Sequence, residues 1–130
     1  MTTATKKMTP AELEDALVQF SGTEAYHKFS PFSKLVLTDG AAFLAKNAGG
    51  GAFWLMDIIA SYQKQCEKDD MLRDIQFWTL TVHDDRSATL ICERDTGNVA
   101  IKQEIPSTDF PLKSVKLYCQ NGVILLPSEY

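Results

Sequence analysis

The fold is decided near the end of the chain, by the stretch Val115-Lys-Leu-Tyr-Cys-Gln120, Asn121-Gly122, Val123-Ile-Leu-Leu126. Asn-Gly between two β-rich runs is the strongest short-range signal for a hairpin, because both residues tolerate the positive φ of a type I′ turn. A two-residue loop places Cys119 opposite Ile124 and thereby assigns alternate side chains to two faces. The face predicted to enter the core carries Val115, Leu117, Cys119, Ile124 and Leu126. The other face is only half polar and carries Lys116, Tyr118, Gln120, Val123 and Leu125.

Further strands are predicted upstream of this hairpin, where the hydrophobic pattern has a period of two. The alternation starts after Asp74 and runs through residues 77–83, 88–93 and 99–105, where Pro106 ends it. The side chains predicted to face the core are Trp78, Leu80, Val82, Leu90, Cys92 and Ile101.

Helices are predicted in the first half of the chain. The sequence Thr9-Pro10-Ala11-Glu12 has the pattern of a capping box with proline at the first helical position, and helical spacing of apolar residues continues over residues 10–20. A second helix is expected over residues 40–47, capped by one residue of the Thr38-Asp39 pair. A third helix is expected over residues 52–65.

These elements predict an α+β protein with two or three N-terminal helices packed on one face of a four- to five-stranded antiparallel meander sheet. The length of 130 residues suits one core. Residues 1–8 are polar and lack periodicity, so we expect a disordered tail there and a single α+β domain over residues 9–130.

The composition of the chain disfavours some classes of binding partner. The formal net charge is −4 with a pI near 5.1, and the lysines and arginines are scattered, which disfavours direct binding of nucleic acid. The longest apolar stretch, residues 52–60, is too short to cross a membrane. Cys66, Cys92 and Cys119 are an odd count without CxxC spacing, so we expect reduced thiols in a small acidic cytoplasmic protein.

The half-apolar outer face of the predicted sheet is the first candidate site. Exposed apolar patches mark contacts with a partner, and aromatic residues suit interface cores. The alternative is that residues 23–37 or the N-terminal tail cover this face. The residues predicted to bind a protein partner, or a second copy in a homodimer, are Phe77, Ile91, Tyr118, Val123, Leu125 and Tyr130.

A ligand pocket near Tyr26, His27 and Asp39 is the second candidate. An enzyme of this kind requires His27 or His83 within hydrogen-bond reach of Asp39 or Asp57 in a cleft. No catalytic residue is assigned, and no cofactor or metal is expected, because the histidines lack metal-ligand spacing.

Two further features have simpler structural interpretations. The repeated Thr-Asp pairs at residues 38–39 and 108–109 could bring two carboxylates together, yet such residues more often cap helices and build turns. Residues 49–51 are three glycines before a helix and could bind an anion, but a flexible connection is favoured because no phosphate-loop Lys, Ser or Thr follows.

Several short pieces together resemble a domain family of unknown function found in small bacterial, plasmid and phage proteins. The pieces are Phe20-Ser21-Gly22 with Tyr26-His27, Thr38-Asp39-Gly40, Trp54-Leu55-Met56-Asp57-Ile58, Phe77-Trp78 with Leu80 and Val82, Thr108-Asp109-Phe110-Pro111, and Leu126-Pro-Ser-Glu-Tyr130. The resemblance implies no activity. Occurrence on mobile elements implies an accessory or anti-defence role.

The sequence therefore favours a non-enzymatic cytoplasmic protein-interaction module. The resemblance extends this to a phage or mobile-element accessory protein that inhibits a host or defence complex by occlusion. The alternative is a small hydrolase or ligand-binding enzyme that uses the pocket at Tyr26, His27 and Asp39.

Overall fold

The computed structural model describes residues 8–130. Its helices are α1 (Pro10–Leu17), α2 (Asp39–Asn47), α3 (Phe53–Ser61), α4 (Gln63–Cys66) and a C-terminal 3-10 turn, η1 (Pro127–Glu129). Its strands are β1 (His27–Lys28), β2 (Val36–Leu37), β3 (Gln76–Val82), β4 (Ala88–Glu93), β5 (Val99–Ile105), β6 (Ser114–Gln120) and β7 (Val123–Leu125). The tail predicted for residues 1–8 lies outside the described residues, apart from Met8.

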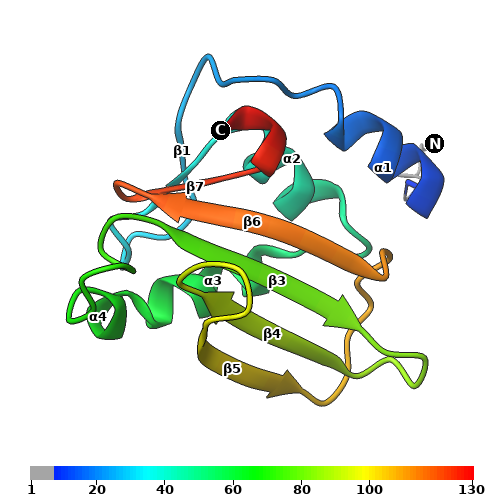
Figure 1. The fold of residues 1–130 in the computed structure, drawn as a ribbon. Coiled ribbons are helices and arrows are strands. Elements are labelled where there is room, and N and C mark those ends of the chain that lie inside the picture. Colours follow the sequence, from blue (N-terminus) through cyan, green and yellow to red (C-terminus); the bar gives the residue numbers. More distant parts are fainter. Residues whose placement is uncertain (1–7) are drawn as a thin grey trace.

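The strands form one seven-stranded sheet in the order β1-β2-β7-β6-β3-β4-β5 (Figure 1). The α+β class is confirmed, but the four- to five-stranded antiparallel meander is wrong, because β2 and β7 are parallel and β6 pairs with β3 rather than β5. The connection from β5 to β6 passes the β3–β4 turn, where the Thr108 N–H donates to the Arg86 carbonyl, and it places Phe110 and Leu112 in the core. Strands β1 and β2 have two residues each, too short for an alternation to be read.

The C-terminal hairpin has the predicted register. Cys119 lies opposite Ile124, and Gln120 lies opposite Val123. Asn121 and Gly122 have φ values of 54° and 77°, as a type I′ turn requires. The five side chains assigned to the core face of this hairpin are all buried.

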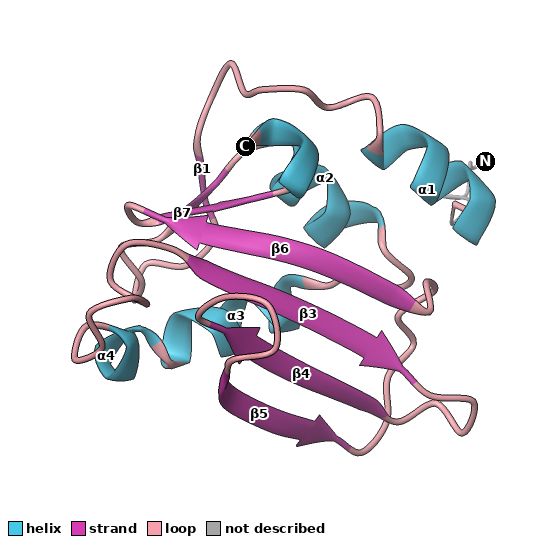
Figure 2. Cartoon of the chain, in the orientation of Figure 1, coloured by secondary structure: helices cyan, strands magenta, loops and turns pink. Residues whose placement is uncertain are grey.

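One hydrophobic core lies between the helices and one face of the sheet. Figure 2 shows α3 and α4 together on the far side of β3 and β4. The predicted inward side chains of β3, β4 and β5 are buried, apart from the half-buried Val82. Trp78 is the largest of them, with an exposed fraction of 1%.

The predicted helix caps are present, whereas the lengths of the helices differ from the prediction. The capping box at Thr9 and Glu12 is present, with reciprocal hydrogen bonds of 2.8 and 3.1 Å. The predicted helix over residues 52–65 is divided at Tyr62, whose N–H donates to the carbonyls of Ile59 and Ala60. The Ser61 hydroxyl donates to the carbonyl of Ile58 at 2.6 Å, a local bond that competes with regular helix.

Candidate functional site

The start of α2 is a junction of polar groups from distant parts of the chain. Thr38 caps the helix, because its hydroxyl oxygen accepts from the N–H of Ala41 at 3.2 Å. The same hydroxyl donates to Oε1 of Glu129 at 2.6 Å, across 91 residues of sequence. The N-cap of α2 is thereby tied to the C-terminus of the chain.

Glu129 makes further contacts at this junction. Its Oε1 also accepts from the N–H of Leu126 at 3.0 Å, and its Oε2 accepts from the N–H of Gly40 at 3.0 Å. A carboxylate in this place interacts favourably with the partial positive charge of a helix N-terminus. A Cβ at Gly40 would lie 2.6 Å from Glu129 and 2.6 Å from Leu126, so glycine allows the close approach. The Thr38-Asp39-Gly40 and Leu126–Tyr130 pieces therefore form one structural unit.

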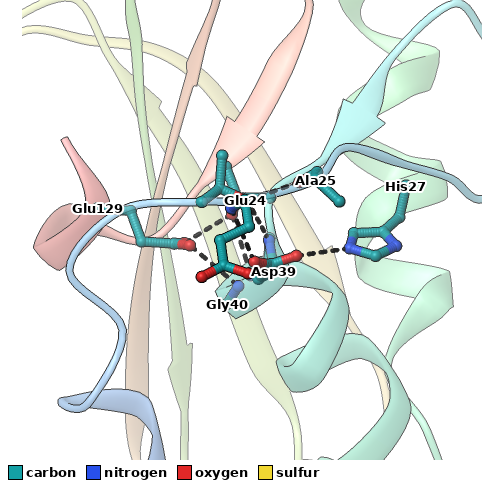
Figure 3. Close-up of polar contacts among 9 residues, drawn as sticks. Glu24, Ala25, His27, Asp39, Gly40 and Glu129 are labelled. Atoms are coloured by element: carbon teal, nitrogen blue, oxygen red, sulfur yellow. Dashed lines mark hydrogen bonds and ion pairs between the residues drawn. The ribbon is translucent and has the colours of Figure 1, made fainter.

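Asp39 holds the preceding loop against α2 (Figure 3). Its Oδ1 lies 2.8 Å from Nε2 of His27, and its Oδ2 accepts from the N–H of Glu24 at 2.9 Å. Its own N–H donates to the Thr23 hydroxyl at 2.8 Å. The N–H of Glu24, followed by the His27 side chain, holds the pKa of the Asp39 carboxyl below its usual value. The carboxylate therefore remains charged at neutral pH and orients the imidazole.

The His27–Asp39 contact meets one requirement of the enzyme hypothesis. The two side chains are 39% and 30% exposed, and the Thr23 hydroxyl beside them already donates to the carbonyl of Ala25 at 2.6 Å. Tyr26 is 62% exposed. The arrangement combines a charged carboxylate with an oriented imidazole, and the nearby hydroxyl already has a partner.

A cavity of about 670 Å³ lies elsewhere, between α3, α4 and residues 30–35. Tyr26, His27 and Asp39 are not among its lining residues. The predicted pocket therefore does not coincide with this cavity.

Two glutamines that sequence reasoning missed line this cavity. The Gln63 and Gln76 amides bond to each other reciprocally, with both distances 2.9 Å. Trp78 Nε1 donates to Gln76 Oε1 at 2.9 Å, and the remaining amide hydrogens of the pair donate to the carbonyls of Ile59 and Leu72. The available signal was Gln76 itself, a polar residue in phase with the inward positions of β3. Because its hydrogen-bonding groups are used internally, this pair stabilises the core.

Aromatic side chains form a line on the outer face of the sheet. Phe77 and Tyr118 pack edge to face at 5.0 Å between ring centroids, and Tyr118 and Tyr130 do the same at 5.6 Å. Tyr130 is 71% exposed, whereas Phe77 and Tyr118 are half-buried. We call Phe77, Tyr118 and Tyr130 the aromatic line.

The other predicted contact residues are less exposed than Tyr130. Ile91 and Val123 are half-buried, and Leu125, which lies opposite Tyr118 in the hairpin, is buried. Residues 23–37 extend the sheet as β1 and β2 rather than covering its centre. The turn over residues 94–98 instead arches over β3 (Figure 1), leaving a pocket of about 230 Å³ bounded by Phe77 and Tyr118.

The second Thr-Asp pair lies at the opposite end of α2. Asp109 Oδ2 accepts from the N–H of Gly50 at 2.9 Å, and a Cβ at Gly49 would lie 2.7 Å from the Asp109 carbonyl. Thr108 accepts from the N–H of Phe110 at 3.1 Å. The two Thr-Asp pairs therefore serve as a helix cap and a turn. The N–H of Gly50, which could have bound an anion, already donates to the Asp109 carboxylate.

His83 and the cysteines complete the set of reactive side chains considered from the sequence. His83 Nε2 lies 2.8 Å from the Thr89 hydroxyl. Burial raises the pKa of Cys66 to about 11, and of Cys92 and Cys119 to about 12, which keeps the thiols protonated. Within residues 8–130, no cluster of three or more His, Cys, Asp or Glu side chains could hold a metal ion, and no helix is long and apolar enough to cross a membrane.

The chain belongs to a family of unknown function (DUF6876), whose family model matches residues 11–130. Membership of a domain family of unknown function, expected from the sequence, is confirmed. No curated protein matches the chain. No solved structure matches it.

Proposed function

We propose that this family member is a non-enzymatic cytoplasmic protein-interaction module that binds a protein partner through the outer face of its sheet. The observation that carries the proposal is the aromatic line, which extends from the half-buried Phe77 to the 71% exposed Tyr130. Aromatic residues are enriched in interface cores because they contribute large contact areas with few rotatable bonds. The pocket beside Phe77 and Tyr118 gives this surface a concave feature for a partner side chain.

Charge indicates the kind of partner. The chain has a formal net charge of −4, so a basic protein surface is favoured for association. A small rigid domain that covers such a surface inhibits by occlusion. The resemblance to phage and plasmid proteins makes a host or defence complex a suitable target for this mechanism.

Affinity capture with matched variants tests the proposal. Tyr130→Glu and Ile91→Glu place a charge on the outer face, and Phe32→Glu places the same charge on a side chain that is 97% exposed at the cavity beside α3 and α4. We expect one stoichiometric partner to be lost from Tyr130→Glu and Ile91→Glu but retained by Phe32→Glu. Retention by all three folded variants would exclude the outer face as the contact surface.

A second candidate function is supported by the 2.8 Å contact between His27 and Asp39. An imidazole oriented by a charged carboxylate is the arrangement of a general base, which makes a small hydrolase the alternative. A panel of p-nitrophenyl esters and phosphates would test it with the native chain and His27→Ala. Turnover that is equal in both proteins would eliminate His27 as the base.

A further inference from the structure

The two edges of the sheet differ in what they offer to another chain. One edge is β1, which has two residues, and the other is β5, which has seven. Strand β5 pairs with β4 on one side and with no described strand on the other (Figure 1). An edge strand presents unpaired N–H and C=O groups that can form a ladder with a further strand. Among the strands of residues 8–130, β5 alone provides such an edge over several residues.

The regular part of β5 has defined limits. The register against β4 shifts between Cys92 and Glu93, where Val99 and Ile101 are the partners and Ala100 is the additional residue of a bulge. Pro106 follows the strand at its other end and has no N–H to donate. The segment free of irregularity is therefore Ile101-Lys-Gln-Glu-Ile105.

This segment is complementary to itself in the antiparallel direction. Centred on Gln103, a two-fold axis places Lys102 opposite Glu104 and Ile101 opposite Ile105. Opposite charges in a cross-strand pair are favourable, and here the same pair forms twice because of the symmetry. Paired residues in this register are either both odd-numbered or both even-numbered. Both members of a pair therefore direct their backbone N–H and C=O groups alike, either toward the other copy or toward β4.

We propose that a second copy of this chain pairs with the β5 edge in this register, which joins the two sheets into one. Lys102 is exposed and forms no ion pair with a described residue. Glu104 is exposed, and its Oε1 accepts from the Thr89 hydroxyl at 2.7 Å, which leaves Oε2 for the second copy. Both charged side chains are therefore in place before association.

The symmetry has a consequence for the rest of the molecule. Directly opposite residues of an antiparallel pair point to the same face, so the dimer would keep both helix layers on one face and both outer faces on the other. The two aromatic lines would then face the same direction, which makes the dimer bivalent for a partner. The dimer itself does not depend on the proposed partner contact.

A lysine in an edge strand commonly discourages edge-to-edge pairing. Lys102 has this effect in every register except those that place a carboxylate opposite it, so it selects the register centred on Gln103. Ile101 and Ile105 are already buried in the single copy, so little further apolar surface is removed from water. The association therefore depends on backbone hydrogen bonds and the two ion pairs, and we expect it to be weak and sensitive to salt.

Charge exchange tests the register. Sedimentation velocity over a concentration series would compare the native chain with Lys102→Glu, Glu104→Lys and the double variant. We expect each single variant to weaken the dimer about tenfold or more, because like charges then face each other twice. The double variant restores the dimer, and an equimolar mixture of the two single variants forms a heterodimer.

Lys116→Glu is the matched control. Lys116 is exposed on β6, so the substitution changes the charge by the same amount at a position away from the β5 edge. It should leave the dimer unchanged. A native chain that remains monomeric throughout the series would overturn the proposal, as would a dimer equally sensitive to Lys116→Glu or unaffected by the single exchanges at β5. The dimer test is independent of the capture experiment, because a loss of the partner from the outer-face variants would not change the sedimentation of the β5 variants.

Discussion

The two halves of the sheet are held together by different means. Strands β3 to β6 have six or seven residues each and pair antiparallel over most of their length. Strands β1, β2 and β7 have two or three residues each, and β2 is parallel to β7. We call these the long-strand half and the short-strand half.

In the short-strand half, side-chain hydrogen bonds provide the stability that backbone hydrogen-bond ladders provide in the long-strand half. Glu129, in the 3-10 turn that follows β7, binds Thr38, which directly follows β2, and Gly40 in the first turn of α2. Asp39 in turn binds His27 in β1. Strands too short to be stable by pairing are thus fixed by carboxylates at one helix N-terminus. The contacts between Thr38-Asp39-Gly40 and Leu126–Tyr130 therefore have a structural role in joining the helix start to the end of the sheet.

Trp78→Ala tests the long-strand half and should have the largest effect. Trp78 is 1% exposed and packs on the Tyr62 ring at 5.9 Å, so truncation leaves a cavity. We expect the free energy of unfolding to fall by about 3–5 kcal/mol, measured by urea denaturation. Trp78→Phe keeps most of the packing and loses the hydrogen bond to Gln76, so it should lose less. A fall under about 1 kcal/mol for Trp78→Ala would contradict the placement of the core.

Glu129→Ala tests the short-strand half. It removes an acceptor of three hydrogen bonds, from Thr38, Gly40 and Leu126, and we expect a loss of about 2 kcal/mol. Hydrogen exchange should quicken first at the N–H groups of Val36 and Thr38, which bond to β7 and its turn.

The exchange pattern provides the control for Glu129→Ala. Amides of β3 and β4 should keep their protection, because their ladders do not involve Glu129. Equal loss of protection in both halves would mean that the sheet opens as one unit and that the distinction between the halves fails.

The same division explains how much the sequence could predict. Alternation over several residues predicted β3 to β6 and their buried faces, and Asn121-Gly122 predicted the register of the last hairpin. β1 has no comparable mark, since a two-residue strand has no period, and β2 is marked only by the short apolar run Leu35-Val-Leu37, which suggests a short strand. The order of the strands was also beyond local patterns, because the pairing of β6 with β3 depends on contacts made far along the chain.

The candidate site was predicted in its residues but not in its arrangement. His27 and Asp39 were identified, and the capping interpretation of Thr38 proved correct. The part of Glu129 was missed, because a partner 91 residues away cannot be inferred from helix spacing. A glycine at the second position of a helix was the one local sign of a close approach there.

Gly40→Ala sharpens the comparison through its coupling to Glu129. The new methyl group would meet Glu129 and Leu126 at 2.6 Å, so we expect a loss of about 1 kcal/mol in the native chain. In a Glu129→Ala background the contact with Glu129 is gone and only the contact with Leu126 remains, so the same change should cost less than in the native chain. A double-mutant cycle from thermal or urea unfolding measures this coupling. Additive effects would show that Gly40 and Glu129 do not constrain each other.

Asp39→Asn should give the smallest effect at neutral pH, and its pH dependence identifies the cause. The folded state lowers the pKa of Asp39 from its ordinary 3.8, chiefly through the N–H of Glu24 and then His27. A lowered pKa contributes stability above the unfolded value, and this stability disappears as the pH falls through the folded value. The native chain should therefore be more stable than Asp39→Asn at neutral pH, with the difference shrinking below about pH 3.8. Urea denaturation of both proteins across acidic pH measures it, and Asp57→Asn, an exposed aspartate on α3, is the control. A difference that stays constant with pH would mean that Asp39 acts through its shape and not its charge.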